Sequence, residues 1–148
     1  MNWTLKHFSE LTNRELYEIL RVRVAIFVVE QTCPYQEIDE ADFDAYHLFL
    51  TDDSGHIRAY LRIFEKNAEY TRLGRILTAD RGKGLGLALL QEGMRAAETL
   101  YGKRRFYIEA QSYAIGFYEK AGFRVTSEEF LEDGIPHVKM EAPPLSRT

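Results

Sequence analysis

The sequence predicts an α+β fold, in which helices flank a mixed, mostly antiparallel central sheet. Three short apolar runs, 46–51, 57–64 and 70–78, are separated by turn-forming stretches, a pattern typical of consecutive strands. Two longer segments, 12–29 and 85–100, carry apolar residues at helical spacing. Because a helix lies between the third of these strands and the next one, the sheet should also contain a parallel pair. The predicted order of elements is β-α-β-β-β-α-β-α-β-β.

The N-terminal part of the chain is predicted to hold a strand and a capped helix. Residues 3–8 alternate weakly in polarity and should form the first strand. The hydroxyl of Thr12 and the carboxylate of Glu15 form a capping-box pattern, so a helix should begin there and end near 29–31. The following connection, 31–45, is predicted to be a solvated loop or one short helix. It carries five acidic residues, namely Glu37, Asp39, Glu40, Asp42 and Asp44.

The C-terminal part is predicted to complete the sheet. Residues 106–110 form an apolar run that indicates a buried strand, and the segment 70–110 is then one parallel crossover. Residues 112–121 should form a short helix that a glycine ends. The last two strands are expected at 123–131 and 137–142, joined through an Asp-Gly turn.

Length and composition fit one soluble domain, 1–148. A net charge of −4 argues against nucleic-acid binding through a basic surface. The single cysteine, Cys33, cannot form a disulfide within the chain, which indicates a reducing compartment. The first residues lack an apolar core of signal-peptide length, and no apolar run approaches the roughly 20 residues of a membrane helix. The sequence therefore predicts a cytoplasmic protein that does not contact membranes, and no motif implies a metal.

The stretch Arg81-Gly82-Lys83-Gly84-Leu85-Gly86 joins a predicted strand to a predicted helix. Glycines let a backbone approach an anion closely, and the first N–H groups of a helix have no intrahelical partner. The helix dipole adds about half a positive charge at that end, and Arg81 and Lys83 add two cations. The stretch is therefore predicted to cradle a phosphate group.

Three ligand motifs compete for this stretch. A P-loop requires Lys-Ser or Lys-Thr after its last glycine, whereas Leu87-Ala88-Leu89 follows here. A dinucleotide-binding fingerprint requires a third glycine, where this stretch has Leu87. That fingerprint also belongs in the first strand–helix turn of a chain, whereas this stretch lies in the middle. The third pattern, R-x-x-G-x-G, resembles the pyrophosphate-binding motif of the GCN5-related N-acetyltransferases (GNAT). A basic, glycine-rich helix start without a ligand remains the plain alternative.

A second motif supports the resemblance. The segment 114–123, AIGFYEKAGF, resembles the A-x-x-[FL]-Y-x-x-x-G-F signature of the same family, and the predicted element order is similar to the GNAT fold over nearly the whole chain. Residues 27–39, FVVEQTCPYQEID, resemble the ElaA-like branch, as do Ala110-Gln111 and 132–137. One departure is that only Ala79-Asp80 separate the strand from Arg81, about two residues fewer than the family pattern.

The resemblance implies an acetyl-CoA-dependent N-acetyltransferase. An acetyl group would pass by direct attack to a primary amine of a small molecule or peptide, with the pantetheine arm between strands 70–78 and 106–110. A non-catalytic acyl-CoA-binding or sensing domain on the same fold is the alternative. The cofactor-binding residues carried over are Ile76, Leu77, Thr78, Arg81, Gly82, Lys83, Gly84, Leu85, Gly86, Leu87, Gln111 and Phe117.

The resemblance names Tyr118 as the general acid, because a phenol is largely protonated at pH 7 and can donate to a leaving thiolate. The general base stays open among Glu109, His137 and Glu30, with His47 a weaker candidate. The acidic connection would favour a cationic acceptor by steering. An exposed edge strand near the C-terminus leaves a homodimer open.

Overall fold

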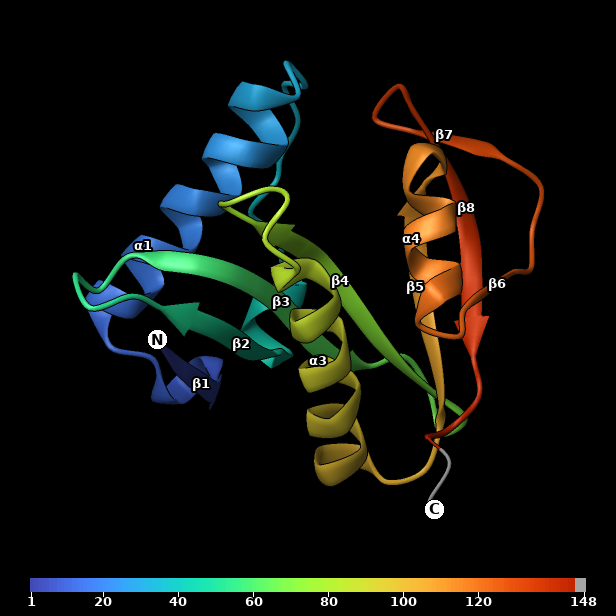
Figure 1. The fold of residues 1–148 in the computed structure, drawn as a ribbon, viewed down its shortest axis with the longest axis horizontal. Coiled ribbons are helices and arrows are strands. Elements are labelled where there is room, and N and C mark those ends of the chain that lie inside the picture. The colour runs from blue at the N-terminus through green and yellow to red at the C-terminus, as the bar shows by residue number, and fades with distance from the viewer. Residues whose placement is uncertain (146–148) are drawn as a thin grey trace.

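The protein is described by a computed structural model over residues 1–145, and its centre is an eight-stranded sheet (Figure 1). The strand order is β1-β2-β3-β4-β5-β8-β6, and β7 pairs with β8. Within these residues, no helix combines the length and apolarity required to span a bilayer. The elements are β1 (Asn2–His7), η1 (Phe8–Glu10), α1 (Asn13–Arg23), η2 (Val24–Glu30), α2 (Ala41–Asp44), β2 (Tyr46–Thr51), β3 (Ile57–Glu65), β4 (Tyr70–Thr78), α3 (Leu85–Tyr101), β5 (Arg105–Gln111), η3 (Ser112–Ala114), α4 (Ile115–Lys120), β6 (Arg124–Val125), β7 (Phe130–Glu132) and β8 (Ile135–Ala142).

The two faces of the sheet carry separate apolar cores. Successive residues of a strand point to opposite faces, so Leu61 and Tyr60 of β3 belong to different cores. The larger core packs α3 and α4 against β2 to β5 and β8, and Figure 1 shows these two helices over β3–β4 and β5. The smaller core packs α1 and η2 against β2, β3 and β4, with Ile19 fully buried. The predicted fold, a mostly antiparallel sheet flanked by helices, is confirmed.

Helix α3 lies very close to the sheet. A Cβ atom built on Gly93 would lie 2.6 Å from the Leu61 side chain, so only glycine allows this approach. Leu90 and Met94 face the core as the helical spacing predicts. Leu87 lies at the same helical spacing, but it is exposed, and Leu89 is buried instead. The first turn of α3 projects past the packed sheet into a cleft, and Leu87 lines that cleft.

The sheet opens between β4 and β5. The two strands pair in parallel from Tyr70 with Arg105 to Arg72 with Tyr107, and no further pairs form among the described residues. Beyond that point the strands diverge into a V (Figure 1). One extra residue of β4 lies between Gly74 and Leu77 relative to β3, and within this bulge Arg75 has φ +51°. The predicted parallel crossover is confirmed, and its two strands separate beyond these three pairs.

Two elements differ from the sequence prediction. The helix that begins after Thr12 ends where expected, but its last seven residues, Val24–Glu30, are π-helical. The strand expected at 123–131 is interrupted between β6 and β7. There the Ser127 hydroxyl accepts the Lys139 N–H at 2.8 Å, so a side chain replaces the backbone partner that a continuous strand would supply.

Candidate functional site

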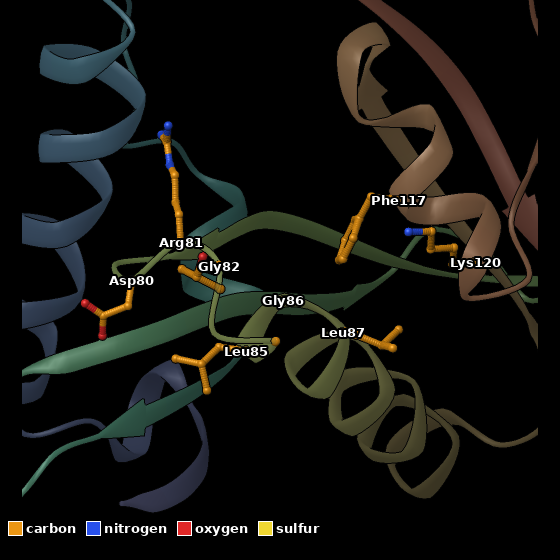
Figure 2. A pocket seen from close by; sticks show the side chains of 10 residues that line it. Asp80, Arg81, Gly82, Leu85, Gly86, Leu87, Phe117 and Lys120 are labelled. Atoms are coloured by element: carbon orange, nitrogen blue, oxygen red, sulfur yellow. The ribbon is translucent and has the colours of Figure 1, made fainter.

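A cleft of about 340 Å³ opens at the N-terminus of α3 (Figure 2). Helix α3 begins after Gly84 with no side-chain cap, so its first N–H groups are left for another partner. The predicted phosphate cradle therefore coincides with a concave site. The lining residues are Thr78, Asp80, Arg81, Gly82, Gly84, Leu85, Gly86, Leu87, Phe117 and Lys120.

The glycines of the cradle serve different purposes. Gly82 and Gly84 have φ values of +78° and +70°, a backbone conformation that side chains disfavour. Gly86 has an ordinary conformation, but a Cβ atom there would lie 3.1 Å from the Phe117 ring. Phe117 therefore packs directly on the backbone of the first α3 turn, which joins the two motifs of the sequence into one site.

The charged side chains of the cradle are arranged differently from the prediction. Arg81 turns away from Phe117 and Lys120 (Figure 2) and forms an ion pair with Glu30 at the end of η2. Asp80 is held by Arg58 of β3, whose Nε lies 2.9 Å from Asp80 Oδ2. Lys120 of α4 borders the cleft, although sequence reasoning did not select it. Its signal was its position two residues after Tyr118 in the second motif.

The predicted strand residues lie where β4 and β5 diverge. Leu77 is buried in the smaller core and Ile76 packs against the larger one, whereas Thr78 reaches the cleft. At the end of β5, the Gln111 side-chain N–H group donates to Gln31 Oε1 at 3.3 Å. This contact links the end of η2 to the far side of the V.

Tyr118 lies in α4, and its ring packs edge-on between Phe117 and Phe123, with centroid distances of 5.1 and 6.0 Å. Burial raises the pKa of its phenol well above the ordinary value. The hydroxyl is therefore protonated throughout the physiological pH range and can act only as a hydrogen-bond or proton donor toward an anion.

The structure brings only two of the four predicted general bases near each other. Glu30 pairs with Arg81 beside the cradle, and His47 is buried between Tyr60 and the Asp42 carbonyl. Glu109 and His137 lie on the adjacent strands β5 and β8. Within residues 1–145, no group of three or more His, Cys, Asp or Glu side chains is placed to hold a metal ion.

The connection 31–45 contains a short helix, α2, as one of the two predicted alternatives had it, but the connection is not solvated. Glu37 and Asp42 are only 2% and 4% exposed. Glu37 accepts from Arg23 Nε at 2.9 Å and from Arg75 Nε at 2.6 Å. Solvation was wrongly predicted because the arginines that bind these carboxylates come from elements distant in the sequence. That the acidic connection steers a cationic acceptor stays a prediction. We call this set the arginine network, and its members are Arg23, Arg62, Arg75, Glu37, Asp39 and Asp42.

Known proteins resemble this chain over nearly its whole length. Residues 14–143 match the acetyltransferase (GNAT) domain family. Protein ElaA of Escherichia coli is 35% identical over 152 residues, which cover 95% of each chain. Its crystal structure superimposes with a TM-score of 0.89, covering 95% of this chain and 98% of ElaA. The crystal structure of an acyl-CoA N-acyltransferase from Pseudomonas aeruginosa has the same TM-score at 38% identity, covering 96% of this chain and 99% of that one.

Proposed function

The chain belongs to the GNAT acetyltransferase family, in its ElaA-like branch, and on that premise we propose that it moves an acetyl group from acetyl-CoA to a primary amine. The acceptor would be a small molecule or a peptide, and its nitrogen would attack the thioester directly. One observation carries the proposal: the uncapped N-terminus of α3 opens into a cleft beside the V between β4 and β5.

The cradle suits the pyrophosphate of acetyl-CoA. An anion at this point would accept from the free N–H groups of the first α3 turn and would meet the positive end of the helix dipole. Lys120 adds a cation from the opposite wall. Gly82 and Gly84 adopt left-handed conformations, and the space where their Cβ atoms would stand is open, so a ligand can approach the loop backbone there.

The V between the strands suits the pantetheine arm. Beyond Arg72 and Tyr107 the facing edges of β4 and β5 no longer pair with each other, so their backbone groups can bind an amide-containing chain instead. The β4 bulge before Leu77 turns the strand at this point. A backbone N–H near Leu77 or Thr78 would then polarise the thioester carbonyl.

Tyr118 supplies the proton of the leaving group in this proposal. Its raised pKa keeps the phenol protonated, and a thiolate is basic enough to accept that proton. A covalent enzyme intermediate is not needed. The one cysteine, Cys33, is buried, and its thiol donates to the Asp133 carbonyl at 3.3 Å.

The cradle is tested by calorimetric titration of acetyl-CoA into the wild type and into Gly84→Asp and Gly84→Asn variants. Both side chains tolerate the left-handed conformation, but only aspartate places a negative charge on the free N–H groups. We expect the asparagine variant to keep most of the affinity and the aspartate variant to lose at least about tenfold. Equal affinities in all three proteins would place the pyrophosphate elsewhere.

The chemistry is tested by thiol release from acetyl-CoA with a panel of primary amines, including a polyamine, free amino acids and a lysine peptide. Tyr118→Phe should keep the acetyl-CoA affinity and lose turnover about 10²-fold or more. Tight acetyl-CoA binding without transfer to any amine would instead support a non-catalytic acyl-CoA-binding domain.

A further inference from the structure

Four ionisable side chains form two neighbouring pairs, one between β4 and β5 at the V and one between β7 and β8 next to it. We call them the strand-end cluster: Arg72, Glu109, Glu132 and His137. The cluster holds two carboxylates but only one permanently charged cation. Its second cation can be only a protonated His137, so the charge balance depends on a proton.

The two carboxylates of the cluster are not equivalent. Glu109 Oε2 accepts the Tyr107 hydroxyl at 2.7 Å and lies 3.4 Å from Arg72 Nη1. Two donors therefore already engage the Glu109 carboxylate. Glu132 has no such donors among the described residues and faces only His137, at 3.5 Å between Oε2 and Nε2. Its side chain is about half exposed, so an incoming amine can reach it.

The backbone fixes the tautomer of His137. Its Nδ1 lies 2.7 Å from the Ile135 carbonyl oxygen, and because a carbonyl only accepts, Nδ1 must carry a hydrogen. In the neutral ring, Nε2 is then the lone-pair nitrogen, and it points at the Glu132 carboxylate. Two acceptors at this distance repel, whereas one shared proton turns the contact into an attraction. The stacked ring of Phe130 keeps the imidazole in place.

We propose that Glu132, paired with His137, is the group that takes the proton from the incoming ammonium, an inference that rests on the proposed N-acetyl transfer. The nitrogen lone pair then forms the C–N bond to the acetyl carbon as the C–S bond breaks. The thiolate takes the proton of Tyr118, and the second nitrogen proton returns to that phenolate through water. Glu109 is a positioning residue, because the negative charge of its carboxylate stabilises the proton once Glu132 has received it.

The electrostatics of the site agree with this assignment. Burial, followed by the charge of Glu109, raises the pKa of Glu132. Asp133 adds to that rise, whereas His137 and Arg72 oppose it. A carboxylate whose pKa moves toward neutrality is better matched to proton transfer at pH 7 than an ordinary glutamate.

The kinetic test compares kcat/KM as a function of pH for the wild type, Glu132→Gln and Glu109→Gln, with Glu128→Gln as the matched control on an exposed neighbouring residue. We expect Glu132→Gln to lose about 10²-fold near pH 7 and to recover as the amine deprotonates unaided. Acetyl-CoA affinity should be unchanged in all four proteins. The assignment would be overturned if Glu132→Gln kept the wild-type kcat/KM at every pH and Glu109→Gln showed the loss instead.

A second test needs no turnover and therefore separates this inference from the proposed reaction. In NMR spectra of the free protein, the His137 nitrogen shifts should report the hydrogen on Nδ1. The Glu132 carboxyl carbon should titrate above an ordinary glutamate, and its midpoint should fall in Glu109→Gln because one cause of the rise is removed. A Glu132 midpoint at the ordinary value would refute the pair, whatever the enzyme assays show.

Discussion

The two acidic regions of this molecule differ in how their charges are balanced. The arginine network joins three carboxylates to three guanidinium groups, and five of its six members are mostly or fully buried. The strand-end cluster joins two carboxylates to one guanidinium and one histidine, at the rim of the V. Carboxylates that are paired with arginines stay charged at neutral pH and do not exchange protons. A site whose second cation is a histidine can gain or lose a proton in that range. The comparison therefore separates carboxylates that hold the fold from those available for chemistry.

The arginine network also fixes the shape of the proposed active site. Arg75 is the left-handed residue of the β4 bulge, and its guanidinium donates to the Glu37 side chain and to the Glu37 carbonyl, at 2.6 and 2.9 Å. Glu37 is held in turn by Arg23 of α1. A non-glycine residue in this conformation costs roughly 1–2 kcal/mol, so these contacts offset a local strain. The buried charges thus position the strand edge that faces the V.

The largest effect should come from breaking the arginine network at its centre. Arg23 is completely buried and bonds both Glu37 and Asp42. Arg23→Met removes the guanidinium that the two buried carboxylates share and leaves Glu37 with Arg75 and Asp42 with Arg62 as their remaining cations. We expect it to lower the free energy of unfolding by about 3–5 kcal/mol. Urea unfolding measures the loss. The control is Arg21→Met, an exposed arginine of the same helix, which should unfold at nearly the wild-type urea concentration.

A second test uses pH to show that the network carboxylates are structural. Burial alone would raise the pKa of Asp42, but hydrogen bonds and charges from Arg23 and Arg62 lower it below the ordinary 3.8. The stabilisation from Asp42 is therefore complete above the unfolded value and disappears as pH falls through the lower folded value. Asp42→Asn should cost about 2 kcal/mol at pH 7 and progressively less below pH 4. A cost that stays constant down to pH 2 would contradict a charge-based role.

The same contrast explains what the sequence could predict. The residues of the cradle, Arg81 to Gly86, are consecutive in the sequence. Its glycines, its helix start and its position after a strand could therefore be predicted from that one stretch. The arginine network joins residues from four separate elements, and their polar side chains look like surface charges until the fold brings them together. The connection 31–45 was accordingly predicted to be a solvated loop or one short helix, with no buried ion pairs.

The strand-end cluster was only half predictable for a similar reason. Glu109 and His137 were selected by residue type and position, but Glu132 was not, because it falls after the predicted strand 123–131. In the structure it is the last residue of β7 and pairs with Ile135 of β8. The π-helical end of the first long helix had no sequence signal either. Apolar spacing identifies a helix but does not distinguish a 3.6-residue period from a slightly wider one over seven residues.

A third test looks for the opposite pH dependence in the strand-end cluster. Because the folded pKa of Glu132 is raised above its ordinary 4.5, the folded state binds more protons than the unfolded chain in that window. Its contribution to stability therefore declines as pH rises through the window. Glu132→Gln should gain stability relative to the wild type between pH 4 and pH 7, a small effect because the side chain is half exposed. A parallel urea series with Glu128→Gln should show no trend.

The smallest effect concerns Glu30, a candidate base that the structure places beside the cradle instead. Its partner Arg81 is 76% exposed, so the pair contributes little to folding, but it holds the Arg81 guanidinium away from Phe117 and Lys120. Glu30→Gln should release Arg81 toward the pyrophosphate and tighten acetyl-CoA binding about two- to threefold, with turnover retained. The gain should vanish in an Arg81→Ala background, which isolates the pair as its source. If Glu30→Gln bound acetyl-CoA normally but lost turnover, Glu30 would be the general base after all. A carboxylate paired with an arginine would then exchange protons, which would contradict the distinction between the two acidic regions.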